Sequence, residues 1–373
     1  MFHALCIVKQ HSSSRTSTKI YFLQINMVDC YIIALFMHFG VLVVFGKPQV
    51  PCYYIFGDSL VDSGNNNELV TEAKANYLPY GIDFPQGVTG RFTNGRTMAD
   101  QIGELLDLDE FIPTYSSATD AQISKGVNYA SGGAGILCET GSHLGDRISL
   151  ERQLNNHNEI VLRLFRLQEN TNEYLRKCLY LFNIGSNDYI NNYLRSTLYN
   201  SSHKYTPDQF ASFLVQQYSQ HLKRLYTLGG RKIVVFGLAP IGCTPAVINI
   251  FGTKGKLCVE SINDLVKQFN DKLKPLVDGI NYDTVDAKFT FINVTHISSL
   301  QHALPGPKLP CCEVMVDGQC AHTATTCPFR ALAIYYDGIH PTEMAHNVIA
   351  TSSYIALSPM DASPYDISNL VRL

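Results

Sequence analysis

The sequence contains no block of like charges. Charged residues make up only 16% of its 373 residues, and 29 Lys and Arg nearly balance 32 Asp and Glu, for a formal net charge of −3. This composition excludes the basic stripe of a nucleic-acid-binding protein, an acidic tail and a polybasic membrane patch. Internal repeats and long low-complexity linkers are also absent. With 46% hydrophobic residues, we expect a single domain with a large core over residues 47–373.

Two common active-site signatures are missing as well. No G-x-S-x-G elbow occurs in the chain, which argues against an α/β-hydrolase. The run Gly132–Gly135 lacks the spacing of a dinucleotide-binding or P-loop fingerprint. We interpret this run as a turn that another segment approaches closely.

The apolar run near the N-terminus is too short for a typical membrane span. Residues 31–45 are almost wholly apolar, and this length fits the core of a signal peptide, whereas a span needs about twenty residues. Val44 and Gly46 are small enough for the −3 and −1 positions of a cleavage site before Lys47. We therefore expect residues 1–46 to be a leader and the protein to be secreted. A buried helix or a signal anchor is the alternative.

The first 26 residues are unusual for a signal peptide. They are polar and rich in serine, whereas Met27 begins a stretch of ordinary signal length. We expect Met27 to be the natural start and the preceding residues to be an extension of the gene model.

Cysteine usage agrees with export. Of eleven cysteines, nine remain once Cys6 and Cys30 leave with the leader, and four crowd into a short segment at 311, 312, 320 and 327. The four do not form a paired C-x-x-C array, and His322 has no partner histidine at ligand spacing, so we expect disulfides rather than zinc. The odd count leaves one thiol unpaired. Two sequons, at Asn200 and Asn293, are candidate glycosylation sites.

Short apolar runs alternate with helical patterns along the chain. We expect strands at 53–56, 179–182, 233–236 and 289–292. Thr206, Pro207 and Gln209 form an N-cap and capping box before an apolar helical stripe that ends at Gly229-Gly230, and a second stripe runs from Leu265 to Leu276. Strands separated by helices predict a mostly parallel sheet, with functional residues at the carboxyl ends of its strands.

Ser59 directly follows the first expected strand, at the start of an expected helix. Backbone N–H groups and the helix dipole at such a position favour negative charge, which suits a nucleophile whose attack creates an oxyanion. The alternative is an ordinary polar turn in which Asp58 and Ser59 cap a helix.

Two further motifs carry residues of the same chemistry. Asn187 follows the second expected strand, where its side-chain amide can donate to an oxyanion, although a loop asparagine bonding its own backbone is the alternative. Asp337 and His340 are three residues apart, so a helical turn would place them on one side, as a base and its orienting carboxylate require. The alternative is that Asp337 caps a turn, Pro341 opens a helix and His340 is merely exposed.

In sequence order, these motifs resemble the plant-type GDSL esterase/lipases of the SGNH-hydrolase superfamily. The resemblance covers about residues 51–370. Its motifs are FGDSLVDSGNNN at 56–67, GRFTNGR at 90–96, GVNYASGGAGI at 126–136, GSNDY at 185–189, DGIHPTE at 337–343 and SPMDASPYDI at 358–367. It implies a flavodoxin-like three-layer α/β/α sandwich with a mostly parallel sheet.

The resemblance also implies roles for the residues of these motifs. Ser59 looks like the nucleophile and His340 like the general base that Asp337 orients. The oxyanion hole would comprise the N–H of Ser59, the Asn187 amide and one glycine N–H, from Gly132 or Gly133. The implied protein is an extracellular enzyme of the cell wall or apoplast that cleaves a small-molecule or lipid ester. The resemblance implies no metal or organic cofactor, no nucleic-acid partner and no membrane span after signal cleavage.

The sequence departs from the family between Phe289 and Cys327. A short Pro-rich segment, HALPGPKLPCC at 302–312, replaces a longer stretch, and Tyr336 stands where the family commonly has tryptophan, which this chain lacks entirely. Two alternatives to ester hydrolysis stay open: a catalytically silent binding or storage protein on the same scaffold, and an acyltransferase that uses the same residues.

Overall fold

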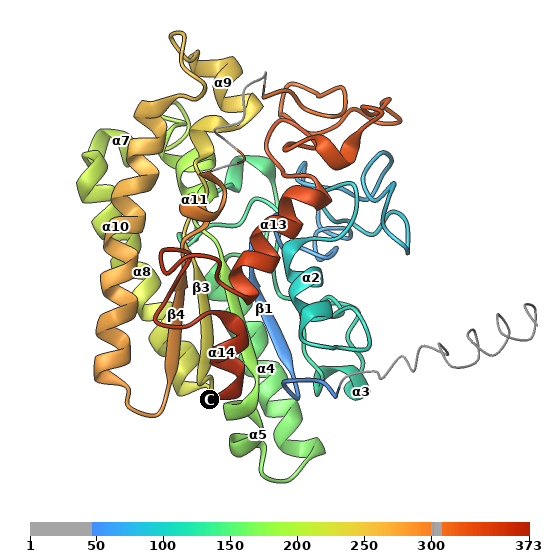
Figure 1. Ribbon diagram of the computed structural model, residues 1–373, viewed down its shortest axis with the longest axis vertical. Coiled ribbons are helices and arrows are strands. Elements are labelled where there is room, and N and C mark those ends of the chain that lie inside the picture. Colours follow the sequence, from blue (N-terminus) through green and yellow to red (C-terminus); the bar gives the residue numbers. More distant parts are fainter. Residues whose placement is uncertain (1–46, 300, 302–307) are drawn as a thin grey trace, which may run out of the picture. The chain divides into compact units, whose positions relative to one another are not determined.

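The computed structural model describes residues 47–299, 301 and 308–373 (Figure 1). The expected leader at 1–46 and the proposed start at Met27 lie outside the described residues. Positions 302–307 of the Pro-rich segment lie outside them too.

The centre of the fold is a five-stranded sheet in which the strands lie in the order β1-β2-β3-β4-β5. The first four strands are parallel, and the short β5 pairs antiparallel with β4. The strand bounds are β1 Tyr53–Gly57, β2 Leu179–Asn183, β3 Lys232–Phe236, β4 Lys288–Ile292 and β5 Ala362–Ser363. All four strands expected from the sequence are confirmed, each to within one residue. Two-sided burial explains their continuous apolar runs.

An irregular segment extends the sheet beyond β1. Residues 125–131 run beside the free edge of β1, where Lys125 O accepts the Tyr53 N–H at 3.0 Å and the Tyr129 N–H donates to Ile55 O at 2.8 Å. Ser131 N–H donates to Gly57 O at 3.1 Å. Counted in chain order with this segment and without the antiparallel β5, the sheet runs 2-1-3-4-5, which is the flavodoxin-like order. The expected fold class is therefore confirmed.

Three long helices cover one face of the sheet: α4 (Leu150–Leu167), α8 (Pro207–Thr227) and α10 (Glu260–Asp283) (Figure 1). Beneath them, alternate residues of the strands form an aromatic core. Its largest members on β1 and β2 are Tyr54, Phe56, Tyr180 and Phe182, all fully buried. Phe56 and Phe182 stack with their ring centroids 4.6 Å apart.

Three other helices cover the opposite face. These are α2 (Met98–Leu105), α13 (Glu343–Tyr354) and α14 (Ile367–Arg372). They pack on the remaining strand residues, including Ile55 and Leu181. Because successive side chains of a strand point to opposite faces, five-residue strands fill both cores and complete a three-layer sandwich.

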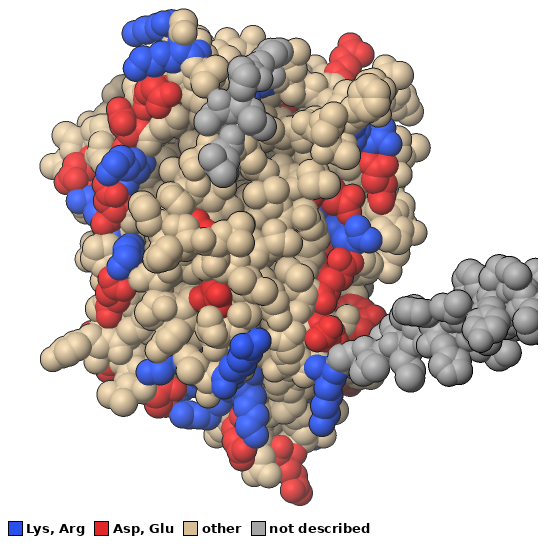
Figure 2. Space-filling view, in the orientation of Figure 1, with Lys and Arg blue, Asp and Glu red and all other residues tan. Residues whose placement is uncertain are grey.

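The remaining helical segments are short. They are α3 Asp120–Ile123, η1 Ser142–Leu144, α5 Thr171–Lys177, α6 Ser186–Asp188, η2 Tyr189–Tyr193, α7 Ser201–Lys204, η3 Ile241–Cys243, α9 Pro245–Phe251, α11 Val294–Ile297 and η4 Arg330–Leu332. Within the described ranges, no helix combines the length and apolar character that a membrane crossing requires. Figure 2 shows most charged side chains of this face, of both signs, along its margins, with few in the broad area between them.

The helix predictions were right in two cases and wrong in one. The helix α8 begins after Thr206, whose side chain forms the expected capping box with Gln209, and α10 contains the second stripe. No helix begins at Ser59, however. Residues 58–62 form a single turn in which the Asp62 N–H donates to Asp58 O at 3.0 Å. The polar residues that follow bond to distant segments instead of continuing this turn.

The cysteines pair as the export interpretation requires. Cys311 pairs with Cys327 and Cys312 with Cys320, so these four residues do not form a zinc site. The other two disulfides are Cys52–Cys178 and Cys243–Cys258. Cys138 is the unpaired thiol of the described chain, and it is exposed. The two bonds at 311–327 stabilise a lobe with little regular structure beside the 336–340 turn.

Candidate active site

Ser59 lies at the carboxyl end of β1, two residues after the strand ends. The side chain of Gln153 holds this strand end on both sides: its Oε1 accepts the Gly57 N–H at 2.9 Å and its Nε2 donates to Gly57 O at 2.8 Å. Gln153 is fully buried on α4. The helix on one face of the sheet therefore fixes where the turn that carries Ser59 begins.

His340 contacts both Ser59 and Asp337. Its Nε2 lies 2.8 Å from Ser59 Oγ, and its Nδ1 lies 2.7 Å from Asp337 Oδ2. The other Asp337 oxygen accepts the backbone N–H groups of Ile339 and His340 at 2.8 and 2.7 Å. The structure thus brings together three residues that the sequence places up to 281 positions apart.

The segment from Asp337 to His340 is a turn and not the helical turn that the spacing suggested. The helix α13 begins only at Glu343, with Thr342 as its N-cap, so Pro341 does not open a helix either. The side chain of Asp337 replaces the helical bonds by accepting two N–H groups of its own turn. The alternative was therefore right that Asp337 caps a turn, but wrong that Pro341 opens a helix and that His340 is exposed, because His340 is buried.

Asn187 lies on α6, directly after β2, and lines the same pocket as Ser59 and His340. Its Nδ2 donates to Ala134 O at 3.0 Å, and its Oδ1 accepts from Asn191 Nδ2 at 2.7 Å. An amide nitrogen carries two protons, so one N–H remains for a ligand. The Ala134 carbonyl can only accept, so it determines that the nitrogen end of the Asn187 amide faces it, and Asn191 then donates to Oδ1. Sequence reasoning missed Asn191, and its spacing of four residues from Asn187 was the available signal.

The two candidate glycines have different partners. Gly132 N–H donates to Asp62 Oδ2 at 3.0 Å, while the other Asp62 oxygen accepts the N–H groups of Gly64 and Asn65. Burial raises the pKa of Asp62 to about 6, and these three bonds partly offset that rise. Gly133 has a φ of 77°, in the left-handed region that favours glycine. Within the described chain its N–H has no partner, which favours Gly133 as a donor to a ligand.

A second buried aspartate holds the other side of the glycine turn. Asp188 accepts the N–H groups of Ile136 and Leu137 at 2.8 and 3.1 Å and the hydroxyl of Thr140 at 2.7 Å. Burial raises its pKa to about 6, against the lowering effect of these bonds. Because Asp188 adjoins Asn187, it sets the distance between the amide and the turn. The sequence analysis did not single out this residue.

Asp58 adjoins Ser59 and is also buried. Its Oδ1 accepts the Leu60 N–H at 3.1 Å, whereas its Oδ2 has no hydrogen-bond partner in the described residues. Burial raises the pKa of Asp58 to about 7, with the nearby His340 acting in the opposite direction. A carboxyl group that changes charge near neutral pH therefore lies next to Ser59.

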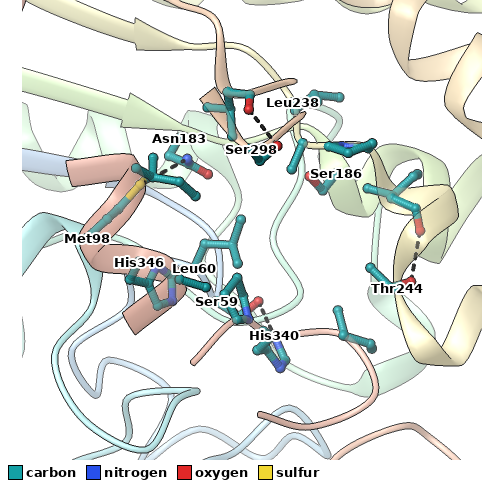
Figure 3. Close-up of a pocket in the computed structure, with 18 of the residues that line it drawn as sticks. Ser59, Leu60, Met98, Asn183, Ser186, Leu238, Thr244, Ser298, His340 and His346 are labelled. Atoms are coloured by element: carbon teal, nitrogen blue, oxygen red, sulfur yellow. Dashed lines mark hydrogen bonds between the residues drawn. The ribbon is translucent and has the colours of Figure 1, made fainter. Parts of the chain in front are cut away.

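A mostly apolar pocket opens beside Ser59 and His340 (Figure 3). Leu60 lines it near Ser59, Met98 lies beside Asn183, and Leu238 lies across the pocket from Ser59 (Figure 3). The pocket also contains His346, which is almost fully buried and whose pKa burial lowers to about 3. In this pocket and in the rest of the described ranges, no group of three or more His, Cys, Asp or Glu side chains is arranged to hold a metal ion.

A model of the GDSL-like lipase/acylhydrolase family matches residues 53–352. The chain belongs to this family. The match spans β1 to β4, the turn of Ser59 and the turn of His340, and agrees with the expected family.

Curated relatives of this GDSL hydrolase match nearly their whole length. A GDSL esterase/lipase of Arabidopsis thaliana is 42% identical over 92% of this chain and 98% of its own. A second GDSL esterase/lipase from the same plant is 44% identical, and the match covers 87% of this chain and 92% of the relative's own length. Among solved structures, a putative GDSL-like lipase from Parabacteroides merdae is 15% identical, with a TM-score of 0.35, over 82% of this chain and 94% of its own. That TM-score is too low to argue from.

The two sequons of the GDSL hydrolase differ in their surroundings. Asn200 is exposed and precedes α7. Asn293 is half-buried, and its side chain caps α11 by accepting the His296 N–H at 3.2 Å. The geometry therefore favours Asn200 as the acceptor of a glycan.

Proposed function

We propose that this protein hydrolyses carboxylic esters through an acyl-enzyme on Ser59. The observation that carries the proposal is the continuous hydrogen-bond chain from Ser59 through His340 to Asp337, with contacts of 2.8 and 2.7 Å. This is the arrangement that a serine nucleophile, a general base and an orienting carboxylate require. Membership of the GDSL-like lipase/acylhydrolase family supports the same chemistry.

In the first half of the reaction, His340 Nε2 takes the proton of Ser59 Oγ as that oxygen attacks the ester carbonyl. The carbonyl π-bond electrons move to oxygen and form an oxyanion. When the tetrahedral intermediate collapses, the bond to the alkoxy group breaks, and His340 gives its proton to the leaving alcohol. In the second half, His340 takes a proton from water as the water oxygen attacks the acyl carbonyl. The bond between the acyl carbon and Ser59 Oγ then breaks, His340 returns the proton to Oγ, and the carboxylic acid leaves.

The oxyanion would bind three N–H groups in this proposal. They are the backbone N–H of Ser59, the free proton of Asn187 Nδ2 and a glycine N–H of the 131–134 turn. Gly133 is the preferred glycine because Gly132 already donates to Asp62. Donors that are already oriented cost little reorganisation at the moment of reaction.

The apolar pocket suits the acyl or alcohol part of a small-molecule or lipid ester. Its walls include aliphatic or sulfur-containing side chains such as Leu60, Met98 and Ile349. Contact with these side chains removes apolar surface of the substrate from water, and each Å² removed stabilises the complex by roughly 25 cal/mol. We therefore expect esters with an apolar chain to be better substrates than acetate esters.

The test is hydrolysis of p-nitrophenyl esters of increasing chain length by the wild type, Ser59→Ala and an exposed-serine control, Ser116→Ala. We expect the wild type and the control to turn over alike, and Ser59→Ala to lose activity while keeping its circular dichroism spectrum. Activity that survives in Ser59→Ala would refute the assigned nucleophile. A folded but inactive wild type would favour the binding-protein alternative, and ester formation with an added hydroxy-acyl acceptor would favour acyl transfer.

We further propose that the mature chain is a single hydrolase domain, 47–373, exported after removal of residues 1–46. Four disulfides support export, because such bonds persist in oxidising compartments. N-terminal sequencing of the exported protein should begin at Lys47, and any residue of 1–26 in it would refute the start at Met27. Glycosidase treatment should reduce the mass of the wild type and leave Asn200→Gln unchanged.

A further inference from the structure

The carboxylate of Asp337 has a donor from outside its own turn. Tyr80 Oη lies 2.6 Å from Asp337 Oδ2, the same oxygen that contacts His340 Nδ1. Tyr80 and Asp337 are both fully buried, and 257 positions separate them in the sequence. Counting this bond, Asp337 accepts four hydrogen bonds, two on each oxygen.

The direction of the tyrosine proton is determined by a second contact. The Cys320 N–H donates to Tyr80 Oη at 3.0 Å, so a lone pair of the hydroxyl is occupied and its proton points to Asp337. Burial and the negative charge of Asp337 raise the pKa of Tyr80 well above its ordinary value. The hydroxyl therefore stays protonated, and remains a donor, at neutral pH.

The three segments that carry Tyr80, Cys320 and Asp337 are also bonded to one another. Cys320 is bonded to Cys312, whose N–H donates to Tyr336 O at 3.1 Å, directly before Asp337. The Tyr336 hydroxyl returns to Pro79 O at 2.5 Å, directly before Tyr80. The disulfide lobe thus joins the two segments that meet at the carboxylate.

We propose that Tyr80 is a positioning residue of the triad, which holds Asp337 Oδ2 against His340 Nδ1 and shares the negative charge of that oxygen. This inference rests on the proposed function of Ser59, His340 and Asp337. Hydrogen bonds to a charged acceptor are stronger than those between neutral groups. A buried carboxylate that loses such a bond keeps its negative charge on the oxygen with less stabilisation. The disulfide lobe that departs most from the family in sequence therefore supports the catalytic geometry.

Tyr80→Phe removes only the hydroxyl, and Tyr77→Phe is its matched control. Tyr77 is the neighbouring tyrosine of the same segment, and its hydroxyl donates to Cys320 O at 2.9 Å without touching Asp337. In Tyr80→Phe the freed Asp337 oxygen is less well oriented, so kcat should fall about tenfold or more while KM changes little. Its stronger negative charge favours protonated His340, so the acid limb of the kcat/KM profile should move upward by a few tenths of a pH unit. Tyr77→Phe should keep the wild-type values.

A wild-type kcat and acid limb in Tyr80→Phe would overturn the proposal. Equal effects in Tyr77→Phe would overturn it too, because they would indicate a packing role for the whole lobe. The NMR signal of the His340 Nδ1 proton gives a readout that needs no substrate. It should move downfield in Tyr80→Phe and stay in place in Tyr77→Phe, and an unmoved signal in both would refute the contact. The NMR result does not depend on the proposed function. Failure of the proposed function would instead be seen as a wild type that hydrolyses esters no faster than Ser59→Ala.

Discussion

Two buried aspartates hold the backbone around the proposed oxyanion site. Asp62 accepts three backbone N–H groups, and Asp188 accepts two together with the Thr140 hydroxyl. Both carboxyls lie away from bulk water, so their bonds are not exchanged for bonds to solvent. The glycine turn between them is consequently fixed before a substrate arrives, which is what electrostatic stabilisation of an oxyanion requires.

The Asn187 amide provides a graded test of this site. Asn187→Ala should lower kcat by about a hundred- to a thousandfold, because one oxyanion donor is lost. Asn191→Ala should lower it less, because the Asn187 nitrogen keeps its bond to Ala134 and only the restraint on Oδ1 disappears. Steady-state kinetics on one p-nitrophenyl ester measures both.

Asn172→Ala, at an exposed position on α5, is the control for these variants. Its kcat should equal that of the wild type. If Asn187→Ala retains wild-type kcat, the amide is not an oxyanion donor. If Asn191→Ala is the more damaged variant, the assumed order of the two residues is wrong.

At the residue scale, the sequence reveals donors and nucleophiles that sit in local motifs, but not the partners that position them. The spacing of Asp337 and His340 is local, so it could be recognised without coordinates. The preference for Gly133 could not, because it depends on Asp62 reaching Gly132 from 70 positions away. Tyr80 was likewise undetectable, since its partner is 257 positions distant.

At the scale of elements, the strands and long helices follow from simple patterns. Strands buried on both faces are continuous apolar runs, and α8 carries both its cap and its stripe in sequence. The segment 125–131 escaped detection because Asn128 and Ser131 interrupt its apolar character. Its place beside β1 depends on bonds to that strand and not on its own propensity.

The capping box of α8 gives a prediction on stability alone. Thr206→Ala removes the side-chain oxygen that accepts the Gln209 N–H, which should lower the free energy of unfolding by about 1 kcal/mol. None of the described α8 residues lines the pocket of Ser59, so kcat should not change. Urea denaturation followed by circular dichroism measures the loss.

Ser212→Ala is the matched control, because this exposed serine lies within the same helix and, among the described residues, its hydroxyl bonds only to Asp208 O. It should leave the free energy of unfolding nearly unchanged. Equal losses in Thr206→Ala and Ser212→Ala would show that the cap contributes nothing specific.

For the molecule as a whole, the aromatic core contains an ionisable group that folding keeps neutral. His157 is fully buried among tyrosine and phenylalanine rings, and its Nδ1 lies 3.0 Å from Tyr129 Oη. Burial lowers its pKa to about 3. The unfolded chain binds a proton near pH 6.5, so between these values the unfolded state holds more protons than the folded state.

The sign of the resulting pH dependence follows directly. The contribution of His157 to stability is complete above pH 6.5 and is lost as the pH falls toward 3, at up to ~1.4 kcal/mol per pH unit. The raised pKa values of Asp62 and Asp188 act oppositely between about pH 4 and 6, since they favour the folded state at the acid end. The effect of His157 is therefore obtained by comparing how steeply the free energy of unfolding changes with pH in the wild type and in His157→Gln.

Urea midpoints measured from pH 7 to pH 4 provide this comparison. His157→Gln removes the titration and keeps an amide near Tyr129, so its free energy of unfolding should fall less steeply toward acid than that of the wild type. Parallel curves for the two proteins would contradict a neutral buried His157.

The three-layer architecture could be predicted because alternating strands and helices have few compact arrangements. What the sequence could not provide at this scale is the route of the 308–342 lobe, which has little regular structure and is defined by disulfides and single hydrogen bonds. Pairings among nine cysteines follow from proximity in space, and the sequence does not encode proximity in any local pattern.

The pocket beside Ser59 separates two tasks along the chain. Part of its apolar wall comes from Leu238 after β3, Val294 on α11 and Ile349 on α13, and none of these side chains takes part in the hydrogen bonds of Ser59, His340 or Asn187. A chemist who wants a biocatalyst for another ester can therefore randomise the wall in a small library while the reacting atoms stay in place. The scaffold thus offers a reaction centre that can be retargeted without being redesigned.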